Sequence, residues 1–377
     1  MKKTICTVLL LICSAMFLCV PVFAENSEEY SNALEDYSES VSQRLGEAID
    51  EETKAELSEN GFTGDYSKLS FKSFLEYIWE SFAGQLLTPV NILARLTAII
   101  ILTSLARSAS VAGGTIYTAF SAVSVLGCIT VIYQAMYTSF SGVCTYLDRL
   151  TEFMLSYIPI YASVTAASGG FSSGGSYYAS CLGICEIIAF VSGNVIMPFL
   201  SIFLALSFTA AINPDMKFSS AAESIKNAVN VILKALMTIF TGFIAVQSIS
   251  GAAADNAASR ALKFGASNFI PIIGGSVSEA YSTVYGSIGI IRSSVGTLGV
   301  IVTAVMLLKP LISMVCLKII LDLSKLIADL MGESEAAELL KSTGFAMSAA
   351  ISTILCFGMM FIIATSVIML TAANSVS

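Results

Sequence analysis

Histidine is absent from the 377 residues of this chain, and charged residues are scarce. Without an imidazole, the chain lacks the usual general base near neutral pH, the commonest zinc ligand and any Ser-His or Cys-His nucleophile pair. Charged residues make up 12% of the sequence, whereas soluble domains carry about 25%. Together with a hydrophobic content of 55%, this argues against an ordinary soluble enzyme and predicts an integral membrane protein.

The few charges are unevenly distributed along the chain. Between Glu25 and Ser70 there are thirteen acidic and three basic residues, and from Phe71 onward there are fourteen of each. The net charge of −8 therefore belongs to one short N-terminal stretch. No basic stripe is present that could neutralise phosphates, so the sequence predicts no nucleic-acid partner.

The nine cysteines form no CxxC pair and no regular framework. Cys181 and Cys185 share a helix face at i, i+4, where they are best interpreted as small apolar side chains in a packed helix. No HExxH or GxGD motif occurs. The sequence accordingly predicts no catalytic residues, no metal site and no cofactor.

The first 24 residues have the three-part pattern of a secretory signal peptide. Basic residues stand at the start, an apolar run covers Ile5–Val20, and a small-residue cleavage site ends at Ala24. An uncleaved anchor is the alternative, which Pro21 and the acidic residues from Glu25 onward disfavour. We therefore predict a signal peptide over 1–24 and a mature N-terminus outside the cytoplasm.

Three further regions follow the leader. Residues 25–70 are predicted to be an acidic extracytoplasmic helical arm, because they hold too little apolar material for a core of their own. Residues 71–85, which include the single Trp79, fit an amphipathic helix at the membrane interface. Residues 86–377 are predicted to form an all-α, polytopic transmembrane helix bundle in the lipid bilayer, because long apolar runs recur there.

We expect about seven or eight membrane passes. Phe153–Ala167 and Phe269–Ile291 are interrupted by Pro or Gly and leave the count open. With the N-terminus outside, Arg107 and the Lys309–Lys341 region should lie in the cytoplasm and Arg149 outside, in moderate agreement with the positive-inside rule. The other expected spans are Leu86–Ala106, Thr115–Tyr137, Tyr177–Asn194, Val195–Ile212, Val231–Ser250, Gly296–Leu317 and Phe345–Ala372.

Three sequence markers recur at the same separation of 112 residues, which predicts an internal duplication over 148–252 and 260–372. Coincidence is the alternative, because few residues between the markers are identical. A duplication would give each unit a broken helix at its start, and transporters bind their substrates at such paired broken helices. The marker pairs are Tyr157–Ile160 with Phe269–Ile272, Pro198–Ser201 with Pro310–Ser313, and Glu223 with Glu335.

Ionisable residues and helix breaks inside apolar spans are the candidate functional positions. A buried charge in the membrane is costly and often functional, and the alternative is a pair between helices or snorkelling to an interface. A proline and a nearby glycine free backbone carbonyls that need partners, and the alternative is a structural kink. The candidate functional or assembly residues are Arg95, Pro159, Glu186, Asn268, Pro271, Gly274 and Glu279.

A set of short sequence strings is more informative than the hydropathy pattern. The strings are KFGASNFIPIIG over Lys263–Gly274, Ser278-Glu279-Ala280, Val295–Gly299 and Lys309-Pro310-Leu311. Over about Asp255–Asn374 the chain thereby resembles the C-terminal half of the stage III sporulation protein AE family. Asp255-Asn256 stands where that family usually has DG, and Arg292–Gly296 replaces its usual K-N-A-hydrophobic-G turn.

This resemblance implies a membrane subunit of the secretion or feeding channel complex between mother cell and forespore, needed for spore development. The expected location is the mother-cell-derived outer forespore membrane. The expected partners are other membrane proteins of that complex and, indirectly, a cytoplasmic secretion ATPase. The family pattern assigns no catalytic residues. A secondary transporter that binds a small solute at the duplicated broken helices is the alternative.

Overall fold

The computed structural model describes residues 31–59, 87–109, 115–168, 171–212, 218–269 and 274–373, together with Trp79, Phe82, Gly84 and Gln85. The elements in these ranges are helices, without a strand among them, which confirms the all-α class. The predicted signal peptide and most of the predicted interfacial helix lie outside the described residues. The elements are α2 (Ser31–Ala48), α3 (Glu51–Glu59), α5 (Leu87–Ala109), α6 (Thr115–Ala167), α7 (Phe171–Val191), η2 (Ser192–Ile196), α8 (Met197–Ile212), α9 (Phe218–Phe269), α10 (Gly274–Leu330) and α11 (Ser334–Ala373).

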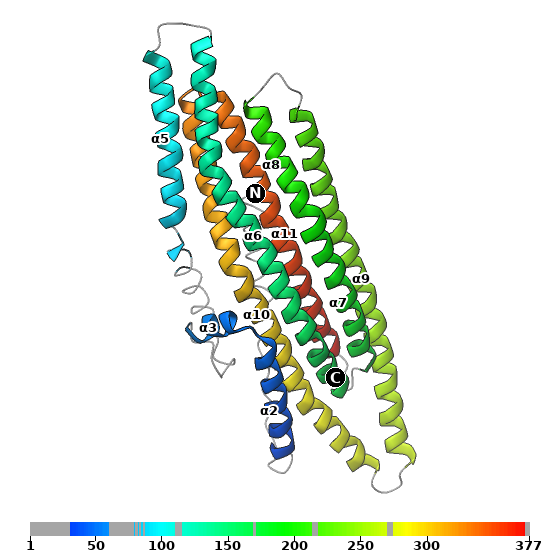
Figure 1. Ribbon diagram of the computed structural model, residues 1–377. Coiled ribbons are helices and arrows are strands. Elements are labelled where there is room, and N and C mark those ends of the chain that lie inside the picture. The colour runs from blue at the N-terminus through cyan, green and yellow to red at the C-terminus, as the bar shows by residue number, and fades with distance from the viewer. Residues whose placement is uncertain are drawn as a thin grey trace.

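The helices from α5 onward form a bundle of rods that alternate in direction (Figure 1). The end of α5 and the start of α6, the end of α8 and the start of α9, and the α10–α11 turn lie at one end, which we refer to as the α8–α9 end. The end of α6 and the start of α7, and the end of α9 and the start of α10, lie at the opposite end, referred to as the α9–α10 end. This arrangement puts the segments that the sequence assigned to the cytoplasm around Arg107 and Ser334 at the same end of the bundle.

Helices α7 and α8 form one rod, because the π-helical turn η2 joins them. In this turn the N–H of Met197 bonds to the carbonyl of Ser192. Pro198 follows directly and has no N–H to give to the preceding turn. The sequence predicted separate spans here, and the π-helical turn keeps the chain helical instead.

The longest rods exceed the thickness of a membrane. Helix α6 has 53 residues and α10 has 57. At 1.5 Å per residue each is about 80 Å long or more, whereas the hydrocarbon core of a bilayer is about 30 Å thick. The bundle therefore extends beyond the hydrocarbon on at least one side.

The described residues contain five helical stretches that are long and apolar enough to cross a membrane, fewer than the seven or eight passes expected. Polar residues that separated the expected spans do not end the helices. Thr115–Tyr137 and Phe153–Ala167 are thus parts of one helix, α6. Val231–Ser250 lies in α9, which is not among the five stretches. The five are Thr88–Ser108, Ala119–Ala167, Leu182–Ile212, Ile288–Leu330 and Ser334–Ser366.

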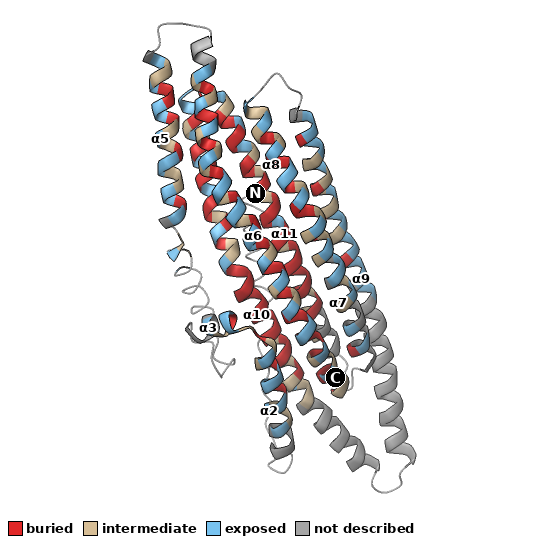
Figure 2. Ribbon diagram, in the orientation of Figure 1, coloured by how far each residue is buried: buried red, intermediate tan, exposed pale blue. Residues whose placement is uncertain are grey.

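Helices α10 and α11 form the centre of the bundle, where Figure 2 shows most of the buried residues. In their most apolar windows 72% and 78% of the residues are buried, against 28–33% in the other three stretches. Large side chains fill the space between α6 and these two helices, among them the fully buried Tyr157, Tyr161, Phe357 and Phe361. The outer helices therefore leave their apolar faces to the surroundings, as lipid-facing helices do.

Helices α6 and α10 approach closely where Tyr157 meets Gly299. The Tyr157 hydroxyl donates a 3.0 Å hydrogen bond to the carbonyl of Val295 on α10. A Cβ atom built on Gly299 would lie 2.3 Å from Cζ of Tyr157. Only glycine fits here, so part of the Val295–Gly299 string that carries the family resemblance has a packing role.

The predicted break at Pro159 is wrong, because α6 passes through this residue as a continuous helix. Pro159 is exposed, while its neighbours Tyr157, Ile158 and Tyr161 are buried against the bundle. Packing on the inner face holds the helix across the missing backbone hydrogen bond. Pro271, the expected counterpart, falls between α9 and α10 outside the described residues, and the duplication is not confirmed.

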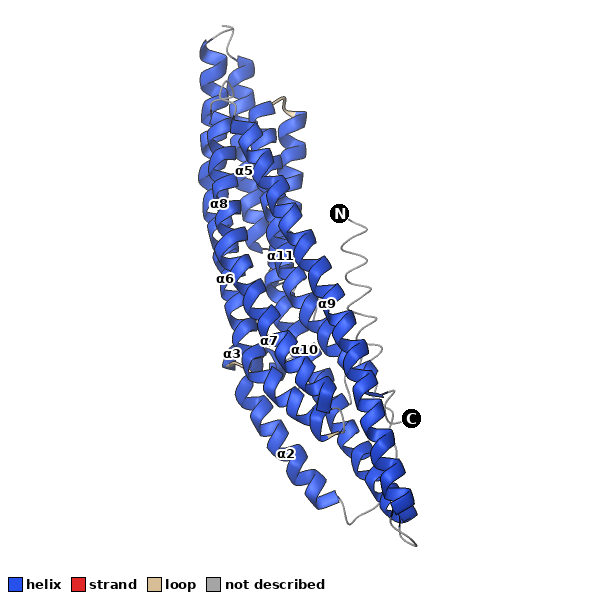
Figure 3. Ribbon diagram, turned by 90° about the vertical axis from the view of Figure 1, so that its right-hand side faces the viewer, coloured by secondary structure: helices blue, strands red, loops and turns tan. Residues whose placement is uncertain are grey.

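The acidic arm packs against the bundle. Val41 and Leu45 of α2 and Ile49 after it are buried, and α2 lies against α6. Figure 3 shows α2 alongside the long helices on one side of the bundle. The apolar residues that are too few for an independent core therefore serve to dock the arm.

Candidate functional site

Three of the residues singled out from the sequence lie apart on the surface. Arg95 is on α5, Pro159 on α6 and Glu186 on α7, and all three are exposed. Exposure of the two charged side chains agrees with the snorkelling alternative better than with a buried pair.

The other four residues fall around the α9–α10 connection. Asn268 lies in the last turn of α9, and Gly274 and Glu279 lie in the first two turns of α10. Pro271 is outside the described residues. The backbone thus brings this group to the α9–α10 end, and a role for it stays a prediction.

Polar side chains meet at the elbow between α2 and α3, where the arm contacts the bundle. Arg149 of α6 contacts Asp50 at 2.6 Å and Glu52 at 2.9 Å, and donates a 3.0 Å hydrogen bond to the hydroxyl of Thr53. Lys309 of α10 lies 3.4 Å from the same Glu52. The elbow therefore links α6 to α10 through carboxylates.

The electrostatics of the elbow favour charged carboxylates. Burial raises the pKa of Asp50, but hydrogen bonds from Thr53 and the Arg149 guanidinium outweigh burial and hold this pKa below its ordinary value. A cavity of about 470 Å³ lies beside the elbow between α6 and α10, and Ser141, Thr145 and Ser313 contribute to its lining. The two cations at the edge of this cavity, Arg149 and Lys309, are already paired with carboxylates of the elbow.

Sequence reasoning missed this cluster for two reasons. Asp148, Arg149 and Glu152 stand between two expected spans, and charged residues seldom lie within an apolar helix, so the sequence does not predict one helix that carries them. The carboxylate partners of Arg149 are about a hundred positions away in the chain. Lys309 was also expected on the side opposite Arg149, which is wrong, because both side chains contact Glu52.

A second polar cluster closes the turn between α10 and α11. Arg107 of α5 forms a 3.2 Å ion pair with the buried Glu333 and donates a 2.9 Å hydrogen bond to the carbonyl of Gly332. Gly332 has φ +72°, a conformation that other residues rarely adopt. Burial raises the pKa of Glu333, although the Arg107 guanidinium opposes the rise. The end of α5 is thereby tied to the central hairpin.

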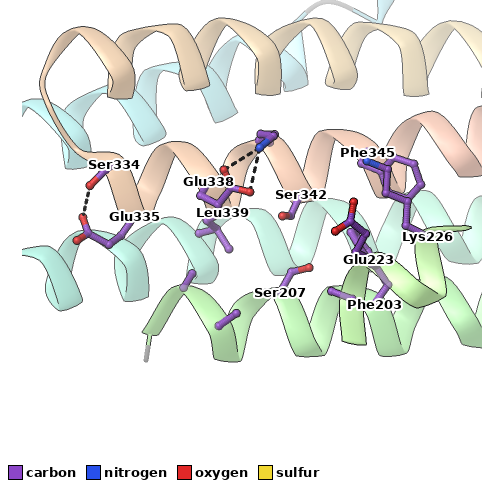
Figure 4. Close-up of a pocket in the computed structure, with 14 residues that line it drawn as sticks. Phe203, Ser207, Glu223, Lys226, Ser334, Glu335, Glu338, Leu339, Ser342 and Phe345 are labelled. Atoms are coloured by element: carbon purple, nitrogen blue, oxygen red, sulfur yellow. Dashed lines mark hydrogen bonds and ion pairs between the residues drawn. The ribbon is translucent and has the colours of Figure 1, made fainter. Parts of the chain in front are cut away.

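A cavity lies near the α8–α9 end, between α8, α9 and α11 (Figure 4). Its volume is about 520 Å³. Carboxylates, ammonium groups, hydroxyls and two phenyl rings form its walls, and Glu223 and Glu335, paired as sequence markers, both belong to it. This is the candidate functional site of the described part of the chain. The recurrence of the two glutamates was the only sequence signal that pointed to it.

These features define a class of protein: a polytopic, all-α membrane bundle whose polar residues join helices to one another. No group of three or more metal-ligating side chains gathers in the portion of the chain that the structure describes.

The chain belongs to the stage III sporulation protein AE family, whose family model matches residues 53–372. It is 27% identical over 228 residues to Stage III sporulation protein AE of Bacillus subtilis (strain 168), and the aligned region covers 60% of this chain and 57% of that protein. The alignment thus spans little more than half the length of this curated relative. No solved structure matches the chain. Family and helices together identify a stage III sporulation protein of the membrane.

Proposed function

We propose that this chain is a membrane subunit of a sporulation-specific secretion or feeding channel complex in the mother-cell-derived outer forespore membrane. It would act in spore development by assembling with other membrane proteins, and indirectly with a cytoplasmic secretion ATPase. Family membership supports a role in sporulation, and the five apolar helices support membrane partners. The role is one of assembly and not of catalysis.

The packed centre of the bundle is the observation that carries this proposal. Helices α10 and α11 are largely buried, and aromatic side chains such as Tyr157 and Phe361 fill the space around them. The rings of these two residues meet edge to face at 5.4 Å. Dense packing around these described helices favours a passage formed together with other subunits over a pore through the centre of this chain.

The alternative, a self-sufficient secondary transporter, depended on a pair of broken helices. One member of the pair is lost, because α6 is continuous at Pro159. The other predicted break, at Pro271, can still be tested by experiment. Changing Glu279 to Gln retains size and hydrogen bonding, so loss of spores or of transport at normal protein level would support a working site there.

Purification from sporulating cells tests the proposal. A tagged chain cross-linked in the membrane should bring down other integral membrane proteins made during sporulation, and deletion of its gene should abolish heat-resistant spores. Purified chain in liposomes should take up no solute. Solute uptake by the chain alone would instead favour the transporter, and normal spores from the deletion strain would refute a role in development.

A further inference from the structure

The cavity at the α8–α9 end has an excess of carboxylates. Glu223 projects from α9, and Glu335 and Glu338 project from the first turns of α11. Glu338 is neutralised by Lys341 at 3.0 Å. Lys226 lies over the ring of Phe345, 4.8 Å from its centre. Glu335 accepts a 3.0 Å hydrogen bond from the hydroxyl of Ser334. The lining thus holds three carboxylates against two ammonium groups, and this excess of negative charge favours a cationic ligand.

A buried hydroxyl without a partner also faces this cavity. Ser207 of α8 is only 4% exposed, and its Oγ atom forms no hydrogen bond with the described residues. Serines in helices usually bond to the carbonyl four residues earlier, as Ser201 does with Met197. In Figure 4 Ser207 and Ser342 stand on facing helices that line the cavity. Because a buried hydroxyl without a partner is costly, Ser207 indicates a polar ligand here.

The remaining wall of the cavity is apolar. Phe203 and Phe345 meet edge to face with ring centres 5.2 Å apart, and Ala210 and Ala211 lie nearby. Arginine and lysine combine an aliphatic stem with a cationic head, and guanidinium groups also stack on aromatic rings. The lining therefore matches a long basic side chain better than a compact cation.

The position of the cavity allows a peptide chain to reach it. The lining includes Ala211 near the end of α8 and Ser334 at the start of α11, next to the two connections at this end of the bundle. Three lining pairs, Ala222 with Ser334, Glu223 with Glu335 and Lys226 with Glu338, share the separation of 112 residues seen in the sequence. In each pair, a residue near the start of α9 and a residue near the start of α11 line the same cavity.

We infer that this cavity binds an arginine or lysine side chain presented by a segment of a partner protein, with Glu223 and Glu335 as charge partners and Ser207 as a hydrogen-bonding group. The inference rests on the proposed function for the existence of a partner, and it adds where and by what chemistry that partner docks.

Peptide binding to the full-length chain in detergent tests the inference. The probe is a fluorescent peptide of alternating alanine and arginine, and its control carries citrulline, the neutral isostere, in place of arginine. Arginine peptide should bind about tenfold more tightly than citrulline peptide. Glu223→Gln and Ser207→Ala should each weaken binding about fivefold or more. The matched variant Glu39→Gln, at an exposed carboxylate on α2, should leave binding unchanged.

Each outcome decides the question. Equal binding of the two peptides, or equal loss in the Glu39→Gln variant, would overturn the inference. Free arginine amide that competes as tightly as the peptide would indicate a small-molecule site and would also overturn it. Thermal unfolding of the variants has to match the parent chain, which we expect for Glu223→Gln because Glu223 is exposed on α9. If the arginine peptide binds as expected but no membrane proteins co-purify with the chain, the proposed complex is refuted and the inference about the cavity is not.

Discussion

Replacing Gly299 with alanine tests whether the contact between Tyr157 and a bare glycine backbone holds α6 against α10. The new Cβ atom would lie 2.3 Å from Cζ and 2.4 Å from the hydroxyl oxygen of Tyr157, well inside contact distance. The ring cannot move away freely, because Phe153, Tyr161 and Phe361 surround it with ring centres 5.4–5.7 Å away. Either the ring or the helix has to shift.

The magnitude follows from three contributions. Overpacking in a filled core costs about 1–3 kcal/mol, and loss of the hydrogen bond to the Val295 carbonyl costs about 1 kcal/mol. The higher helix propensity of alanine offsets about 1 kcal/mol of this loss of stability. We therefore expect a net loss of about 1–3 kcal/mol in Gly299→Ala. Gly289→Ala, on the same helix with no atom within 4 Å of the added Cβ, should instead be neutral or stabilising.

A thiol-reactive dye provides the assay, because Cys128, Cys316 and Cys356 are buried and free and become reactive on unfolding. The apparent Tm of Gly299→Ala should fall by a few degrees. Tyr157→Leu removes the clashing ring atoms, so alanine at Gly299 should cost much less in that background. An unchanged Tm for Gly299→Ala, or an equal penalty in both backgrounds, would refute the close-contact reasoning.

Three further predictions concern the charged contacts and the topology. Arg107→Met should lower the free energy of unfolding by about 3 kcal/mol in thermal melts, because it leaves the buried carboxylate of Glu333 without its cation. The control Arg95→Met, at an exposed position on the same helix, should have little effect. Because the pKa of Asp50 is lowered in the docked arm, its charged carboxylate stabilises docking at every pH above the ordinary pKa of an aspartate. Hydrogen-exchange protection of α2 should therefore stay constant from pH 7 to 5 and decline only below about pH 4. Reporter fusions at Ser334 should report the cytoplasm and those at Asn32 the exterior, and the same compartment for both would contradict the rod arrangement.

The helical class and the family could be predicted from the sequence, because hydropathy and one specific string determine them. The number of rods could not. Asp148 and Arg149 resemble a loop when only their neighbours are considered, and their helix persists because the arm supplies carboxylates from a distant part of the chain. Pro159 likewise resembles a break, but buried neighbours on the opposite face hold α6 together.

The candidate site was harder to predict than the fold. Its walls come from three helices, and most of its lining, including Ser207 and Phe345, looks like ordinary membrane-helix sequence. A hydroxyl that lacks a partner is visible only once neighbouring helices are in place. The 112-residue recurrence of Glu223 and Glu335 gave a signal, but nothing in the sequence indicated that the two would face one cavity.

An uninterrupted stretch of α10 connects the contact with the arm to the α10–α11 turn. From Lys309, which contacts Glu52, to Leu330 the helix rises about 32 Å, close to the thickness of the hydrocarbon layer. Beyond Lys309, the charged residues of this stretch form ion pairs within the helix, Lys318 with Asp322 and Lys325 with Asp329, so the part between the two contacts carries no net charge. A bilayer around this stretch would put the arm at one interface and the turn at the other. Hydrophobic mismatch would then act on both contacts together, and lipids with longer or shorter acyl chains would alter how firmly the arm is docked.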